Sequence, residues 1–359
     1  MIIGINAAAA FKQPRTGVEE YCYQIIKHMA MLEESKKHRF VLYVPKKIKV
    51  SPQWDLPNHF EIKYLDFPVA WTQGRLAIEM FKNMPNVLFI PVHVLPLVHP
   101  FASVVTIHGL EYEYHPDMYS SKQVKYLRWA TKYAAEKARS IIAVSKTTKN
   151  DLVKLYNINP EKIMVIQHGV DHPGKLPRGE KGYKYLFYIG RIEEKKGLKI
   201  LIAAFNILKE KYRVPHKLIL AGPDGFGSEV IKKTANLSAY FKDIFFPGYL
   251  DEEEKIFTLR NASVFVWPSM REGFGMPLLE AMAWGVPIVA SKISINEEVT
   301  GNAALFFDLP SESDLAGKIN RVIKSDELAR ELIKSGRMQV KKYSWQRASK
   351  KTLKLLTEL

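Results

Sequence analysis

The chain has 359 residues, of which 47% are hydrophobic and 25% are charged. This composition is typical of a globular protein of two ordinary domains and excludes a disordered chain. The single cysteine, Cys22, excludes an internal disulfide and a cysteine-based metal site, and it is consistent with a reducing compartment. The formal net charge of +16 indicates an anionic partner, such as nucleic acid, an acidic membrane surface or a phosphorylated substrate, unless it reflects compositional bias alone.

The residues Met1 to Asn6 lack the basic segment of a signal peptide and pass directly into a strand-like pattern. No apolar run approaches the ~20 residues that a membrane-spanning helix needs. We therefore expect a cytoplasmic protein, which its basic charge could hold at the inner face of the cell membrane.

The N-terminal half alternates predicted strands with predicted helices. Apolar runs predict strands at residues 2–6, 40–44, 87–90, 104–107, 141–145 and 162–167, and helical spacing predicts helices at 18–31 and 121–139. The segment from Lys46 to Asp66 carries several prolines and lysines and is predicted to be an irregular surface excursion. The alternation predicts a parallel sheet with right-handed crossovers.

Two residues of this half lie where a doubly wound sheet binds its ligand. Gly17 ends the loop between the first strand and its helix, although a simple helix-start glycine explains it equally well. His108 follows the predicted strand 104–107, at the carboxyl end that faces the ligand in parallel sheets.

The helix predicted at 121–139 carries six basic residues interleaved with aromatic and apolar ones. Either its apolar stripe faces the core and its basic face is solvated, or it lies on a membrane surface.

The segment 171–184 is rich in proline and glycine and is predicted to link two domains. We expect an N-terminal domain over 1–170 and a C-terminal domain over 185–344, with a closing helix, 345–359, that packs back on the first domain. The second strand-and-helix series predicts strands at 185–189, 217–221, 244–246, 263–267, 286–291 and 304–306, and helices at 313–325 and 326–342.

The stretch from Trp267 to Ser291 predicts a strand, a glycine loop, a helix and a second strand. Pro277 suits a helix start and Gly285 a helix end. The free N–H groups at such a helix start form an anion site. Glu272 lies in the loop, and Glu280 lies in the first turns of the helix, where dipole electrostatics alone would also favour an acid.

A second anion-binding pattern follows the strand 185–189. Arg191 offers a planar fork suited to phosphate oxygens, and Lys196 adds a compact charge before the next helix. A basic loop on a basic protein is the alternative interpretation.

These motifs closely resemble those of a known family. The run E-G-F-G-x-P-x-x-E-A-M-A-x-G-x-P, with its E-x(7)-E spacing, and the pattern G-R-x-x-x-x-K-G resemble the retaining glycosyltransferases of the GT-B fold, the group of the glycogen and sucrose synthases and many bacterial mannosyl- and glucosyltransferases. The resemblance implies an α/β protein of two doubly wound, Rossmann-like domains that face a cleft. The N-terminal domain is then the acceptor side, and the C-terminal domain binds the nucleotide sugar.

The resemblance also implies roles for individual residues. Arg191 and Lys196 would bind the diphosphate, Glu280 the ribose hydroxyls, and Glu272 the hydroxyls of the donor sugar. His108 matches the T-x-H-D pattern of the family, although Gly109 stands where the family commonly has Asp. The expected catalytic residues are Glu272, His108, Arg191 and Lys196, and the expected substrate-binding residues are Gly17, Arg191, Lys196, Tyr249, Leu250, Gly273, Phe274, Gly275 and Glu280.

The expected reaction is retaining transfer of a hexose from a nucleoside-diphosphate sugar, of the GDP-mannose or UDP-glucose type, to a glycan or lipid-linked acceptor. Preorganised cations would stabilise the leaving diphosphate, so neither a metal nor another cofactor is expected. An anionic membrane surface is a further expected partner. The alternatives are a basic nucleic-acid- or membrane-binding module and a nucleotide-sugar epimerase of the same fold; no nucleic-acid motif is recognised, so nucleic acid is not an expected partner.

Overall fold

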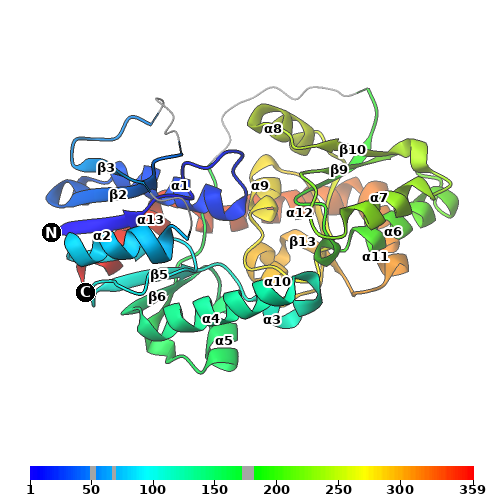
Figure 1. Cartoon of the computed structure of the whole chain (residues 1–359). Coiled ribbons are helices and arrows are strands. Elements are labelled where there is room, and N and C mark those ends of the chain that lie inside the picture. Colours follow the sequence, from blue (N-terminus) through cyan, green and yellow to red (C-terminus); the bar gives the residue numbers. More distant parts are fainter. Residues whose placement is uncertain (49–53, 67–69, 172–181) are drawn as a thin grey trace. The chain divides into compact units, whose positions relative to one another are not determined.

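The structure is a computed structural model that describes residues 1–48, 54–66, 70–171 and 182–359. The chain divides into two compact units (Figure 1). Unit 1 comprises Met1–Tyr114, Ser120–Gly169 and Ser344–Leu359, and unit 2 comprises His115–Tyr119 and Val170–Tyr343. Most of the predicted linker, 171–184, lies outside the described residues.

Unit 1 contains a seven-stranded parallel sheet in the order β3-β2-β1-β4-β5-β6-β7. Its strands are β1 (Ile2–Asn6), β2 (Arg39–Pro45), β3 (Phe60–Leu65), β4 (Val87–Ile90), β5 (Ser103–Ile107), β6 (Ser140–Ala143) and β7 (Ile163–Val165). Its α-helices are α1 (Gly17–Ala30), α2 (Ala77–Lys82), α3 (Glu111–Tyr114), α4 (Ser121–Lys137), α5 (Lys146–Tyr156) and α13 (Trp345–Thr357). The strand order reverses between β1 and β4, as in doubly wound sheets.

The expectation of an irregular excursion from Lys46 to Asp66 is wrong for residues 60–65, which form the edge strand β3. Phe60 and Leu65 of this strand are buried while Glu61 and Tyr64 are exposed, because an edge strand is covered less completely than a central one. Lys63 of β3 forms an ion pair with the buried carboxylate of Glu79 in α2, at 2.6 Å. That contact fixes the edge strand against its crossover helix.

Unit 2 contains a six-stranded parallel sheet in the order β10-β9-β8-β11-β12-β13. Its strands are β8 (Tyr185–Ile189), β9 (Lys217–Ala221), β10 (Ile244–Gly248), β11 (Val264–Trp267), β12 (Ile288–Ser291) and β13 (Ala304–Phe307). Its α-helices are α6 (Leu198–Glu210), α7 (Ser228–Asn236), α8 (Glu252–Arg260), α9 (Met276–Trp284), α10 (Ser294–Thr300), α11 (Glu312–Lys324) and α12 (Asp326–Gln339). Each sheet is covered by helices on its faces.

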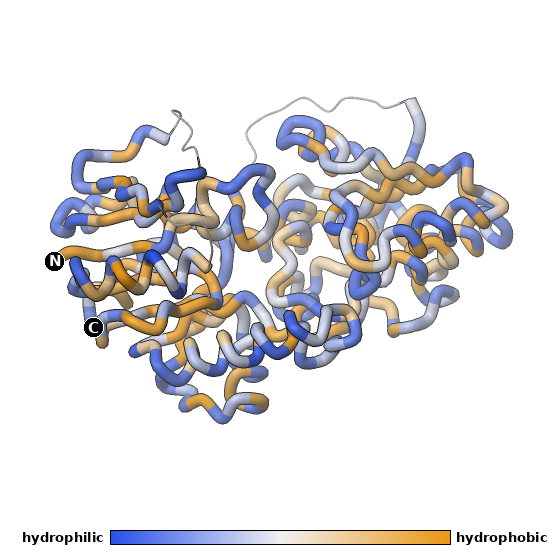
Figure 2. The backbone as a smooth tube through the Cα atoms, in the orientation of Figure 1, coloured by the Kyte–Doolittle hydropathy of each residue, from blue (hydrophilic) through white to orange (hydrophobic). Residues whose placement is uncertain are grey.

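The strands of both units are largely hydrophobic (Figure 2). All residues of β4, β5, β11 and β12 are buried. Strands that are buried on both faces read as continuous apolar runs, which is why the central strands were predictable from sequence. Among the described residues, no helix has the length and apolar character needed to cross a membrane.

Helix α13 belongs to unit 1 although it follows unit 2 in the chain. It packs against α1, and the Ser349 hydroxyl donates a hydrogen bond to the carbonyl of Ile25 at 3.0 Å. The ring of Trp345 stacks on His168, with centroids 5.6 Å apart. Gly169 allows this approach, since a Cβ atom there would lie 2.0 Å from the backbone nitrogen of Trp345.

Candidate active site

The candidate active site of unit 2 lies at the reversal of its strand order. Strands β8 and β11 are neighbours in the sheet although β9 and β10 separate them in the chain. Ligands of doubly wound sheets bind outside the carboxyl ends of the strands at this point. Arg191 follows β8 and Glu272 follows β11, so both sequence motifs meet at the switch point.

The backbone ties the two loops together and brings their charged side chains into contact. The amide of Met270 donates to the carbonyl of Lys195 at 2.9 Å. Gly197 has φ +67°, and a Cβ there would lie 2.2 Å from the Pro268 carbonyl oxygen, so only glycine permits this approach. Lys196 Nζ then lies 2.7 Å from Glu272 Oε1, and the two side chains are only 12% and 11% exposed.

Aromatic rings pack beside this ion pair. Lys196 Nζ lies 5.4 Å from the ring centroid of Trp267, and Trp267 stacks on Tyr188 with centroids 5.5 Å apart. The Tyr188 hydroxyl donates to the Arg191 carbonyl at 3.0 Å. Burial raises the pKa of Tyr188, and the nearby Glu272 and Glu193 carboxylates raise it further. Tyr188 is therefore a neutral donor that orients the Arg191 backbone.

The N-terminus of α9 forms the third part of the site and confirms the predicted glycine loop and helix. Gly275 occupies the N-cap with φ +90°, and Pro277 follows in the first turn. Gly273, Phe274 and Gly275 are buried, and Phe274 packs edge-on against Tyr343. The helix ends at Gly285 in the left-handed conformation, as predicted.

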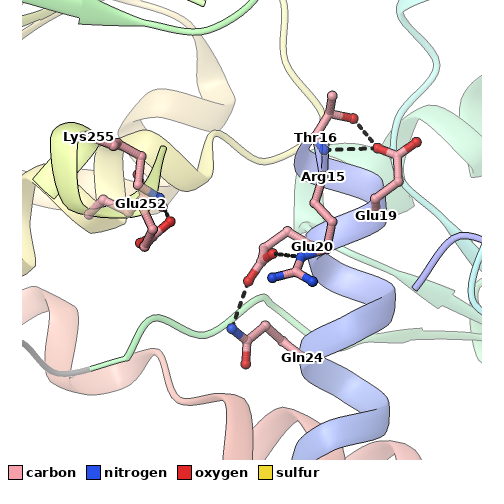
Figure 3. Close-up of polar contacts among 8 residues, drawn as sticks. Arg15, Thr16, Glu19, Glu20, Gln24, Glu252 and Lys255 are labelled. Atoms are coloured by element: carbon pink, nitrogen blue, oxygen red, sulfur yellow. Dashed lines mark hydrogen bonds and ion pairs between the residues drawn. The ribbon is translucent and has the colours of Figure 1, made fainter. Parts of the chain in front are cut away.

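Glu280 lies one turn into α9 and contacts a lysine that the sequence motifs did not indicate. Lys255 Nζ lies 3.0 Å from Glu280 Oε1 and 2.9 Å from Glu252 Oε2. Figure 3 shows Lys255 and Glu252 on α8 in contact. The only sequence signal for Lys255 is its position after three consecutive glutamates, which reads as ordinary helix capping.

The remaining predicted residues of unit 2 lie at strand ends. Arg191 is exposed. Tyr249 and Leu250 follow β10, and Tyr249 is 52% exposed. The three therefore stay predictions that rest on position and on the family pattern.

Gly17 belongs to unit 1 and is the first residue of α1. The Glu19 carboxylate accepts the backbone N–H and the hydroxyl of Thr16, and Arg15 Nε donates to Glu20 at 2.7 Å (Figure 3). Burial would raise the pKa of Glu19, but hydrogen bonds from Thr16 and Lys12 outweigh it and lower that pKa. The start of α1 is thus a charged, well-capped turn, and binding by Gly17 stays a prediction.

His108 also lies in unit 1, at the carboxyl end of β5. Its Nε2 lies 2.8 Å from the carbonyl oxygen of Pro91, and its ring packs edge-on against Tyr21. Burial lowers the pKa of His108 to about 4, so the imidazole is neutral at pH 7. Gly109 has φ +151°, a conformation that aspartate rarely adopts, which gives a backbone reason for the departure from the family pattern.

Among residues 1–48, 54–66, 70–171 and 182–359, no group of three or more His, Cys, Asp or Glu side chains is arranged to hold a metal ion.

Two family models match the chain in succession. The model described as Glycosyltransferase Family 4 matches residues 15–172, and the model described as Glycosyl transferases group 1 matches residues 176–339. The chain belongs to the group 1 glycosyltransferases. It is a retaining enzyme of the GT-B fold that takes a sugar from a nucleotide-sugar donor.

Individual relatives agree with this assignment. The chain is 25% identical to the O-antigen chain mannosyltransferase B of Escherichia coli, over 97% of this chain and 98% of that protein. The sucrose-phosphate synthase of Thermosynechococcus elongatus has a similar fold, with a TM-score of 0.78, 18% identity and coverage of 100% and 98%. Anabaena HepE in complex with UDP-glucose is similar at a TM-score of 0.76, with 16% identity and coverage of 100% and 99%.

Proposed function

We propose that this glycosyltransferase moves a hexose from a nucleoside-diphosphate sugar, of the GDP-mannose or UDP-glucose type, to a glycan or lipid-linked acceptor without a metal ion. The observation that carries this proposal is the contact of Lys196 with Glu272 beside the N-terminus of α9. This contact supports a site in which Lys196 and the N–H groups of α9 bind the diphosphate, while the neighbouring Glu272 carboxylate binds the sugar.

The chemistry requires stabilisation of a leaving diphosphate. As the bond from the sugar C1 to the phosphate oxygen breaks, negative charge grows on the diphosphate. Arg191, Lys196 and the N–H groups of α9 would stabilise that charge, and fixed donors contribute most where charge develops in the transition state. The acceptor oxygen would bond to C1 on the same face, and its proton would pass to the departing phosphate oxygen.

The two carboxylates would take different parts of the donor. Glu272 would share Lys196 with the diphosphate and accept hydroxyls of the sugar, which orients C1. Glu280, eight residues later, would accept the ribose hydroxyls. Binding through the ribose and diphosphate would then position the sugar for reaction, and such positioning can lower the activation barrier by several kcal/mol.

The relatives support both donor types. The Escherichia coli relative is a mannosyltransferase, and HepE is described in complex with UDP-glucose. The test is a donor-hydrolysis screen with GDP-mannose, UDP-glucose and ADP-glucose in the presence of EDTA. We expect release of the nucleoside diphosphate from one donor. Activity that disappears in EDTA and returns with magnesium or manganese would contradict metal-independent stabilisation.

A lipid-linked acceptor is supported by the outer face of α4. Tyr126 and Trp129 are 47% and 44% exposed, and the exposed Lys122, Lys125 and Lys132 lie around them on the helix. Aromatic rings with basic residues suit the interface of an anionic membrane. We therefore propose that the enzyme works as a peripheral protein at such a surface.

A further inference from the structure

Lys255 is a largely enclosed cation in contact with Glu280 of the candidate site. It projects from α8, which packs against α9, and its side chain is only 20% exposed. A lysine is rarely buried to this degree unless it is paired. Its two partners are the carboxylates of Glu252, 71% exposed, and Glu280, 24% exposed.

The electrostatic balance keeps this lysine charged. Burial alone would lower the pKa of Lys255, but the carboxylates of Glu280 and Glu252 outweigh burial and raise the pKa above its usual value. A permanent ammonium 3.0 Å from Glu280 Oε1 restricts the rotation of that carboxylate. Glu252 supplies the second negative charge, so the ammonium is held from both sides.

Stability does not explain this arrangement well. Replacement of a buried ion pair by apolar groups of similar volume is often neutral or stabilising. Helix α8 is already capped by Asp251 and Glu254, whose backbone N–H donates to Asp251 Oδ1 at 2.8 Å, so Lys255 is not needed to start the helix. The other feature of Lys255 is its direct contact with the carboxylate of Glu280.

We propose that Lys255 is a positioning residue that orients Glu280 and so sets the selectivity for ribose over 2′-deoxyribose in the nucleotide. The inference rests on the proposed contact of Glu280 with the ribose. A carboxylate can accept both hydroxyls of a ribose only when its plane is aligned with them. A carboxylate that is already aligned loses less entropy on binding, so the second hydroxyl contributes more to affinity.

The experiment compares each ribonucleotide with its 2′-deoxy form. UDP, GDP, 2′-deoxy-UDP and 2′-deoxy-GDP are titrated by calorimetry into the wild-type protein and into Lys255→Met, which keeps the packing volume and removes the charge. We expect the wild-type enzyme to prefer the ribonucleotide by about tenfold or more, since a hydrogen bond to a charged group is worth that much. In Lys255→Met the preference should fall to about threefold or less, through weaker binding of the ribonucleotide.

Two further variants separate positioning from simple damage. Lys255→Arg keeps the charge and should retain more of the ribose preference than Lys255→Met. Lys209→Met is the control, because Lys209 forms a comparably enclosed ion pair with Asp243 at 2.6 Å. Asp243 directly precedes β10, so this pair lies at the opposite end of the strands from the candidate site. Lys209→Met should leave the ribose preference unchanged. In turnover assays, Lys255→Met should raise the donor KM more than it lowers kcat, because the reacting bond is not involved.

The outcome also distinguishes this inference from the proposed function. If Glu280→Gln abolishes the ribose preference but Lys255→Met retains it, Lys255 does not position Glu280 and this inference alone is wrong. If Glu280→Gln leaves the preference intact, the proposed ribose contact is wrong and the inference fails with it. In the double variant, the loss should be no larger than in Glu280→Gln alone, because both changes remove one interaction.

Discussion

At the scale of single residues, the candidate site pairs a cation with an anion in a nearly enclosed position. Lys196 and Glu272 form an ion pair at 2.7 Å, so in the proposed site a diphosphate would meet a lysine that already has a partner. An unpaired buried charge would cost several kcal/mol, and in the proposed site Lys196 would have an anionic partner both before and after the diphosphate binds.

Removal of either proposed phosphate contact should weaken nucleoside-diphosphate binding. Arg191→Ala and Lys196→Ala each delete a charge-assisted contact worth about 1.5–3 kcal/mol. Calorimetry with UDP and GDP should show a loss of about tenfold or more in each variant. Lys199→Ala, which removes an exposed pair with Glu194, serves as the control. Unchanged affinity in both site variants would refute the assignment of the diphosphate site.

Glu272→Gln should separate catalysis from nucleotide binding. The amide cannot accept sugar hydroxyls as a carboxylate does, and it no longer neutralises Lys196. We expect kcat to fall by about tenfold or more, because a hydrogen bond to a charged group contributes that much, while affinity for the free nucleoside diphosphate is retained. Full transfer activity in this variant would show that Glu272 has no role at the sugar.

The sequence predicted the residues of the candidate site, but not all of the contacts that the structure shows for them. Arg191 and Lys196 stand in one strand–loop–helix segment and Glu272 and Glu280 in another, so each pair belongs to a local pattern that is visible in the sequence. Lys255 lies 25 residues before its partner Glu280, and its contact depends on how α8 packs on α9. Such a contact depends on tertiary packing and leaves no periodic signal.

At the scale of elements, Gly169, which follows β7, lies against the backbone at the start of α13. Gly169→Ala would place a Cβ 2.0 Å from the Trp345 nitrogen, so α13 must shift, and we expect a loss of about 1–3 kcal/mol or more in unfolding free energy. Gly317→Ala is the matched control, because nothing lies within 4 Å of its added Cβ in α11. Gly317→Ala should raise the unfolding free energy by about 0.5–1 kcal/mol. Equal urea midpoints for the two variants would refute the proposed crowding.

The same junction should make unit 1 sensitive to acid. Burial lowers the pKa of His168 well below its usual value, and His108 adds to the effect. A histidine with a lowered pKa in the folded state contributes stability above the unfolded value of about 6.5 and loses it as the pH falls towards the folded value. Stability should therefore decrease below about pH 6.5, by on the order of 1 kcal/mol per pH unit for this group.

His168→Phe tests this acid sensitivity, because phenylalanine keeps a ring against Trp345 and Tyr21 but binds no proton. Hydrogen exchange of the α1 amides, measured from pH 7 to pH 5, should show a shallower loss of protection in the variant. Parallel pH profiles for both proteins would show that His168 does not titrate on unfolding.

The elements themselves were predictable wherever burial was complete. The runs that form β8, β9 and β11 contain almost only apolar residues, and both ends of α9 carry their own signals in Pro277 and Gly285. The edge strand β3 was missed, because Glu61 and Lys63 interrupt its apolar pattern. Lys63 forms an ion pair with the buried Glu79 of α2, and the sequence alone does not show that these two residues are in contact.

At the scale of the whole molecule, the net charge is +16, and we propose that the basic residues on the outer face of α4 bind an anionic membrane. Wild-type protein should co-sediment with phosphatidylglycerol vesicles and not with phosphatidylcholine vesicles, and the binding should fade with salt. Lys122→Gln, Lys125→Gln and Lys132→Gln combined should reduce binding by on the order of a hundredfold at low salt, since each lysine contributes about 1 kcal/mol.

The control for membrane binding removes the same number of charges elsewhere. Lys350, Lys351 and Lys354 are exposed on α13, and their replacement by Gln should change binding little if the face of α4 is responsible. Equal losses in the two triple variants would assign the effect to net charge alone. Pelleting with both lipids, or with neither, would remove the membrane from the proposal.

The return of α13 to unit 1 also determines the order in which the protein matures during translation. Residues 344–359 complete unit 1, yet the ribosome makes them only after the entire run from Val170 to Tyr343. Unit 2 needs only the short segment His115–Tyr119 from earlier in the chain and can finish folding while synthesis continues. The apolar face of α1 that receives α13 stays uncovered throughout that interval, so the half of the enzyme that is made first is the last to mature.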